Sequence, residues 1–114
     1  MKNKSTESLD SKSLEMRISV IQKDRLLPYR HALVVANMAE HLLRLLKKGE
    51  VNFSYTRQDN TVCYARGTLL NYASCFGKLY VNLPSNQFLL YYDLYKNQWR
   101  TFHLAFLLNV FEKY

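Results

Sequence analysis

The chain has 114 residues, a formal net charge of +7 at pH 7, and 48% hydrophobic and 14% aromatic residues. This length suits one compact domain, and the apolar content is too high for a wholly disordered chain. No apolar run approaches the roughly 20 residues of a membrane-spanning helix. We therefore expect a soluble globular protein without membrane contact.

The first 12 residues, MKNKSTESLDSK, are rich in Ser, Lys and Asn, a composition typical of a disordered tail. They lack the apolar stretch and cleavage site of a secretory signal, so we expect a cytoplasmic protein. Cys63 and Cys75 have no cluster of His or Cys residues nearby. This spacing predicts two reduced thiols rather than a zinc module or a disulfide scaffold.

Residues 13–48 are predicted to form a helical lead-in. Apolar residues alternate over residues 14–20 as in a strand, but Leu14, Ile18 and Ile21 also share one helical face. We favour the helix, because the neighbouring residues are helix formers.

An amphipathic helix is predicted from Pro28 to Lys48. Apolar residues recur there at intervals of three and four, at Val34, Met38, Leu42, Leu45 and Leu46. Lys48 suits the negative end of the helix dipole, and Gly49 is able to take a positive φ at the exit. The helix should therefore end near Lys48.

After Gly49 the apolar spacing changes to two, the period of a strand. Five alternating segments follow, separated by turn residues: EVNFSYTR (50–57), TVCYARGTL (61–69), KLYVNL (78–83), QFLLYYDL (87–94) and QWRTFHL (98–104). Five short strands are too few for a sandwich. They favour a small, strongly bent antiparallel barrel, whose closure removes exposed edges.

Residues 49 to about 110 resemble the WYL-like family of Sm-like, SH3-like small barrels. The residues that carry the resemblance are Val51, Phe53, Tyr55, Ala65, Gly67, Thr68, Leu69, Tyr92, Asp93, Trp99, Arg100, Phe102, Leu107 and Leu108. The family is widespread as short proteins in Bacteroides-type bacteria and their mobile elements. The resemblance implies an α+β fold, with the helical segment followed by a five-stranded SH3-like barrel over residues 49–114 and a short C-terminal helical turn.

The resemblance also implies a regulatory barrel that senses a ligand or associates with nucleic acid. Two departures from the family bear on this expectation. Asp59-Asn60 stands where Asp-Gly is more frequent, and residues 70–84, LNYASCFGKLYVNLP, replace the usual charged, glycine-containing loop.

The segment QWRTF contains two candidate binding residues. In a strand, Trp99 and Arg100 point to opposite faces, so they cannot both enter one pocket. An arginine there suits phosphate oxygens, and an aromatic ring suits stacking on a base. The alternative is structural, with Phe102 and Leu104 packed inside, Arg100 bonded to Asp93 or to a carbonyl across the hairpin, and Trp99 covering the mouth of the barrel.

A second candidate face lies on the strand that contains Arg66 and Tyr64. With Arg57 it would combine cations with stacking platforms, Tyr64, Tyr91 and Tyr95, as single-strand binders do. The alternative is an ordinary solvated strand face. The candidate ligand-binding residues are therefore Tyr64, Arg66, Trp99 and Arg100.

Catalytic chemistry has little support in the sequence. His31, His41 and His103 are dispersed, and no carboxylate pair, phosphate-binding loop or nucleophile motif is present. We expect no cofactor, no metal and no enzymatic activity. Two functions remain: binding of nucleic acid or a nucleotide-like anion, or a protein-interaction or homo-oligomerisation module that uses the helix at 28–48 or the apolar LAFLLNVF segment.

Overall fold

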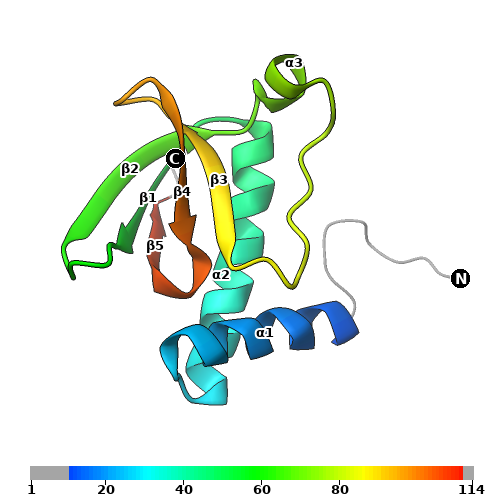
Figure 1. Ribbon diagram of the computed structural model, residues 1–114, viewed down its shortest axis with the longest axis vertical. Coiled ribbons are helices and arrows are strands. Elements are labelled where there is room, and N and C mark those ends of the chain that lie inside the picture. The colour runs from blue at the N-terminus through cyan, green and yellow to red at the C-terminus, as the bar shows by residue number, and fades with distance from the viewer. Residues whose placement is uncertain (1–10, 112–114) are drawn as a thin grey trace, which may run out of the picture.

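The computed structural model describes residues 11–111, in which two long helices precede a curved sheet (Figure 1). The elements are α1 (Ser11–Arg25), α2 (Tyr29–Lys48), β1 (Val51–Thr56), β2 (Val62–Thr68), α3 (Tyr72–Phe76), β3 (Phe88–Asp93), β4 (Gln98–His103), the 3-10 turn η1 (Leu104–Phe106) and β5 (Leu107–Phe111). Of the predicted tail, residues 1–10 lie outside the described residues, whereas Ser11 and Lys12 already belong to α1. No helix among residues 11–111 is long and apolar enough to cross a bilayer.

Helix α2 lies along one face of the sheet, and α1 lies across its N-terminal end (Figure 1). The buried face of α2 is rotated from the predicted one: Val34 is 61% exposed, whereas Val35 is buried. The buried residues are Ala32, Val35, Ala36, Ala39, Leu42, Leu43 and Leu46. Three of these residues are small alanines, which allow neighbouring elements to approach closely. The prediction used only the large apolar residues and therefore missed the face that the alanines mark.

Gly49 ends α2 in a way that differs from the prediction. Its φ of 177° is extended backbone, and its N–H donates to the carbonyl of Leu45 at 3.0 Å. The chain therefore leaves α2 directly into β1 without a left-handed residue. Left-handed conformations occur instead in the hairpin turns, at Asn60 and Asn97.

The five strands form one antiparallel sheet in the order β4-β3-β2-β1-β5. Strands β4 and β5 are therefore the two edges of the sheet. The prediction of a closed barrel is wrong, because these two edge strands do not pair with each other. β5 pairs with β1 only as far as the Tyr55–Leu107 pair, with a register shift beside Tyr55. The α+β class is confirmed, with N-terminal helices followed by a five-stranded sheet.

One predicted strand is wrong, because residues 78–83 form none, and the fifth strand is β5 at Leu107–Phe111 instead. The predicted C-terminal helical turn is not tested, since residues 112–114 lie outside the described residues. Residues 107–111 form a strand because they pair with β1. This pairing also buries Leu107, which is 1% exposed. Residues 78–83 instead contact the backbone of β3 through side chains, because Asn82 donates to the Phe88 carbonyl and the Tyr80 hydroxyl accepts the N–H of Leu90.

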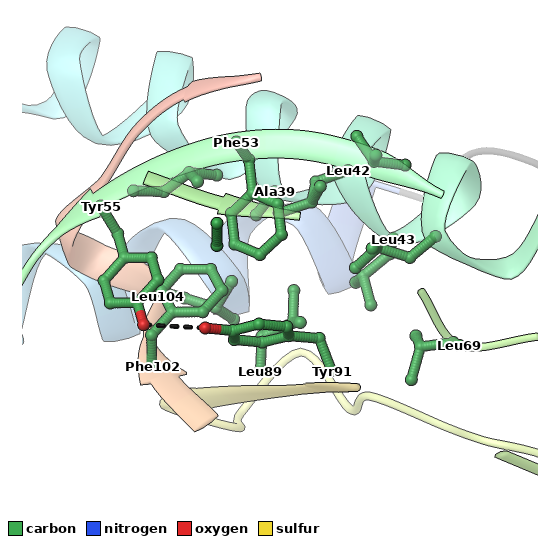
Figure 2. Packing of buried hydrophobic residues seen from close by; sticks show 14 of the residues in the cluster. Ala39, Leu42, Leu43, Phe53, Tyr55, Leu69, Leu89, Tyr91, Phe102 and Leu104 are labelled. Atoms are coloured by element: carbon green, nitrogen blue, oxygen red, sulfur yellow. Dashed lines mark hydrogen bonds between the residues drawn. The ribbon is translucent and has the colours of Figure 1, made fainter. Parts of the chain in front are cut away.

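The main core lies between α2 and the inner face of the sheet (Figure 2). Phe53 lies at its centre, with ring centroids 5.0 Å from Tyr91 and 5.5 Å from Phe102. Burial of each such side chain contributes about 1.5–3 kcal/mol. A smaller core joins α1, α2 and η1 through Ile18, Ile21, Ala32, Val35, Ala36 and Ala105.

Candidate functional site

A cleft of about 570 Å³ opens between the end of β1 and the edge strand β4. It exists because η1 turns the chain at Leu104–Phe106, so β5 reaches no further along β1 than Tyr55. The lining residues come from α1, β1, the β1–β2 hairpin, β3, β4 and η1. Elements far apart in sequence therefore meet at the open part of the sheet.

Four aromatic side chains line the cleft: Tyr55, Phe88, Phe102 and Phe106. The rings of Tyr55 and Phe102 are stacked, with centroids 4.4 Å apart and an interplanar angle of 14°. The His103 ring lies edge-on to Phe88 at 4.7 Å and to Phe106 at 5.6 Å. Tyr55 and Phe102 are each only 4% exposed, so the apolar surface that a ligand can reach comes from Phe88 and Phe106.

Two arginines, Arg57 and Arg100, lie at the cleft. Arg100 has a side chain 31% exposed, and its Nε is 3.6 Å from Oδ2 of Asp93, across the β3–β4 hairpin. Burial acts to lower the pKa of Arg100, but interactions with the hydroxyls of Tyr91 and Tyr55 outweigh it and raise the pKa. The guanidinium therefore stays charged, and its five N–H donors exceed these two hydroxyls and the Asp93 carboxylate as partners, which leaves donors for a ligand.

A pair of tyrosine hydroxyls lies beside Arg100. The hydroxyls of Tyr55 and Tyr91 are 2.9 Å apart and hydrogen-bonded in the core (Figure 2). Burial raises the pKa of Tyr91 far above its ordinary value, and the hydrogen bond with Tyr55 raises it further. Burial likewise raises the pKa of Tyr55. Both hydroxyls are therefore protonated at neutral pH.

Helix α1 is fixed to the other side of the cleft. Nδ1 of His103 lies 3.5 Å from Oδ2 of Asp24, and Gln87 donates a hydrogen bond to Oδ1 of Asp24 at 2.9 Å. Arg25 lies over the Phe106 ring at 5.2 Å and donates to the Ala105 carbonyl at 3.1 Å. These contacts hold the end of α1 against β4 and η1.

The structure does not gather the four sequence-predicted residues. Arg66 donates to the Glu50 carboxylate at 2.9 and 3.2 Å and to the Asn52 side chain at 3.1 Å. Tyr64, two residues earlier on the same face of β2, is 70% exposed. Tyr91, once a candidate stacking platform, is wholly buried. Only Arg100 of the four lies at the cleft.

Trp99 points away from Arg100, as the strand spacing predicted. It packs edge-on against Phe76 at 5.2 Å, Tyr92 at 5.2 Å and Tyr72 at 5.9 Å. Trp99 thus lies against α3 rather than over the mouth of the barrel. The remainder of the structural alternative is confirmed, because Phe102 is buried and Arg100 pairs with Asp93.

Several cleft residues have no signal in the sequence. Asp24, Phe88, His103 and Phe106 meet only because α1 docks beside β4, and that docking is invisible in local spacing. The sequence predicts Arg57 at the hairpin on the face of Arg66, whereas the structure places it at the cleft. Within residues 11–111, no three His, Cys, Asp or Glu side chains gather as a metal site would require.

The helical lead-in, the curved five-stranded sheet and the tight hairpins are those of a Sm-like, SH3-like small barrel domain. Residues 39–108 match a family model described as WYL_2, Sm-like SH3 beta-barrel fold. The chain therefore belongs to the WYL_2 family. Neither the curated proteins nor the solved structures include a match to it. The family match carries no organism, so the Bacteroides-type origin stays a prediction.

Proposed function

We propose that the chain is a non-catalytic module whose cleft binds a nucleotide-like anion, either a free nucleotide or a segment of single-stranded nucleic acid. The observation that supports this most is the combination of Arg57 and Arg100 with the accessible rings of Phe88 and Phe106 around about 570 Å³. Small-molecule sites have volumes of about 300–1,000 Å³. On the family resemblance alone, we place this binding in a cytoplasmic, regulatory context in bacteria or their mobile elements.

The chemistry of the cleft matches the two parts of a nucleotide. A planar guanidinium forms paired hydrogen bonds with phosphate oxygens and retains its charge at any physiological pH. Aromatic side chains stack on bases without strong sequence preference, at about 1–3 kcal/mol per base. The net charge of +7 adds a general attraction for polyanions.

Binding without chemical reaction is inferred from the cleft carboxylate. Asp24 accepts a hydrogen bond from Gln87 and faces His103, so it is engaged in holding α1 in place. A general base needs a free path to the proton that it removes. We infer that Asp24 and His103 position the wall of the cleft.

Fluorescence anisotropy with labelled single-stranded DNA, duplex DNA and RNA, with nucleoside monophosphates as competitors, tests this proposal. We expect saturable binding of single strands that weakens with salt, and a loss of at least about tenfold in affinity for Arg100→Ala. Arg57→Ala provides a second cleft variant, because Arg57 is exposed and its removal leaves the core unchanged.

The matched control is Arg66→Ala on the outer face of β2. Arg66 is already paired with Glu50, so its removal should leave affinity near that of the unmodified chain. The reverse pattern, a loss with Arg66→Ala and none with Arg100→Ala or Arg57→Ala, would move the site to the outer face. Absence of saturable binding to any probe would reject the proposal.

A protein-interaction module is the second candidate, and a separate feature favours it. Leu107, in the apolar C-terminal segment first considered for this role, lies in the core at 1% exposure. Large apolar side chains are instead exposed between α3 and β3, where Leu79 is 80% and Val81 66% exposed. This surface is separate from the cleft.

A further inference from the structure

Residues 78–83, KLYVNL, have the alternation of a strand without being one. Leu79, Val81 and Leu83 are 80%, 66% and 55% exposed, whereas Tyr80 and Asn82 are half-buried. The predicted common face of the three apolar residues therefore exists, but it faces solvent instead of the core. A strand-forming sequence is one that fits a pleated, half-buried surface, and here one side of that surface is missing.

The inner side of this segment is held firmly in place. Asn82 donates to the carbonyl of Phe88 at 2.9 Å and to the hydroxyl of Tyr80 at 3.1 Å, and the Tyr80 hydroxyl accepts the N–H of Leu90 at 3.3 Å. Arg17 of α1 donates to the Asn82 carbonyl at 3.3 Å. The segment thus runs from α3 to β3 in a defined position (Figure 1).

Within the described part of the chain, the backbone of this segment lacks partners over its first part, whereas the carbonyls of Asn82 and Leu83 accept hydrogen bonds from Arg17 and from the N–H of Asn86. Among residues 11–111, no hydrogen bond engages the backbone N–H or C=O groups of Leu79, Tyr80 or Val81. An ordered segment with unpaired backbone groups and alternating apolar side chains is a template for strand addition from another chain.

The charge distribution indicates which chain would add. From residue 69 to residue 92 the only charged side chain is Lys78, in a chain with a net charge of +7. Two such chains repel each other elsewhere, so an uncharged apolar face is where copies can meet. An acidic partner would gain nothing from this face. The first ten residues contain only Met1 and Leu9 as apolar residues, too few to cover it.

We propose that two copies of the chain associate through residues 79–83, paired antiparallel about a two-fold axis near Val81. In this register Val81 faces its own copy, and Leu79 faces Leu83 of the second copy, so one apolar face serves both chains. Leu70 and Leu79 line one surface pocket, which extends the apolar contact toward α3. The association uses no residue that lines the cleft, so it stands independently of ligand binding.

Light scattering after size exclusion, over a range of concentrations of the full chain, measures this association. We expect a dimer whose dissociation constant rises at least about 100-fold in Val81→Lys, because two like charges would face each other. Val34→Lys is the matched control, since Val34 on α2 is exposed to a similar extent, 61% against 66%. A chain that remains monomeric at every concentration, or equal disruption by both variants, overturns the proposal.

Disulfide trapping tests the register. In a Cys75→Ser background, which leaves only the buried Cys63, Val81→Cys should form a covalent dimer on oxidation, because paired strands bring opposite Cα atoms to about 4.5–5.5 Å. Leu79→Cys should not, since its two copies would lie four residues apart, about 14 Å. Cross-linking of Leu79→Cys as readily as Val81→Cys would overturn the two-fold arrangement.

Discussion

At Gly67 the sheet has no room for a side chain. A Cβ there would lie 2.6 Å from Cδ2 of the Tyr91 ring, which is fixed in the core by its hydrogen bond to Tyr55. We expect Gly67→Ala to lower the free energy of unfolding by about 1–3 kcal/mol, as overpacked cores do. Gly49→Ala is the control, because nothing lies within 4 Å of its added methyl group. Equal stabilities of the two variants in urea denaturation would contradict this.

The Tyr55–Tyr91 pair predicts an alkaline limit to stability. Because burial raises the pKa of Tyr91 above its ordinary value of 10.0, the folded chain keeps a proton above pH 10 that the unfolded chain releases. The stabilisation is complete below pH 10, and above it the free energy of unfolding falls by about 1.4 kcal/mol per pH unit for this proton. In urea denaturation, the free energy of unfolding of Tyr91→Phe should fall less steeply between pH 10 and 11 than that of the unmodified chain. An unchanged slope would contradict the prediction.

Single residues show how far the sequence predicts the site. Period-two spacing separates Trp99 from Arg100, and the predicted hairpin places Asp93 among the possible partners of Arg100. The same spacing placed Arg66 with Tyr64 but did not reveal that Glu50 pairs with Arg66. Partners that depend on the meeting of distant elements, such as Asp24 and His103, leave no local pattern.

A buried ion pair contributes to the docking of α1 on α2. Nε of Arg17, which is 1% exposed, lies 2.6 Å from Oε2 of Glu40 on α2. We expect Arg17→Met to lower the free energy of unfolding by about 3 kcal/mol, since it leaves a largely buried carboxylate without its partner. The double variant Arg17→Met with Glu40→Leu should regain most of this loss in urea denaturation. A double variant as unstable as the single one would contradict this explanation.

At the scale of elements, the spacing of apolar residues predicts the helices and strands whose partners lie nearby in the sequence. Helix α2, both hairpins and four of the five strands fall where the spacing placed them. Residues 78–83 and 107–111 have similarly apolar sequences, and only the second reaches the free edge of β1. A strand-like segment joins a sheet only if the turn before it directs the chain to a free edge. Here the 3-10 turn at Leu104–Phe106 directs residues 107–111 to the edge of β1.

The whole molecule combines an open sheet with an excess of positive charge. If the positive side chains formed one broad binding face, a nucleic acid would contact them through many phosphates. Its affinity would then fall steeply with salt. In the proposed function the cleft would restrict direct contacts to Arg57 and Arg100, because the nearby Arg25 is engaged with Phe106 and the Ala105 carbonyl. The net charge would then attract an anionic ligand from a distance, and only these two arginines would bind its phosphates.

Salt dependence separates these two arrangements. Each phosphate contact with a single strand contributes a slope of about −0.7 to the logarithm of affinity against the logarithm of salt, so two arginines give about −1.4. Arg100→Ala should reduce the slope to about −0.7, and Arg66→Ala should leave it unchanged. Anisotropy titrations at four or more salt concentrations measure these slopes. A slope steeper than about −3 would mean that single strands contact the basic surface of the whole chain rather than the cleft.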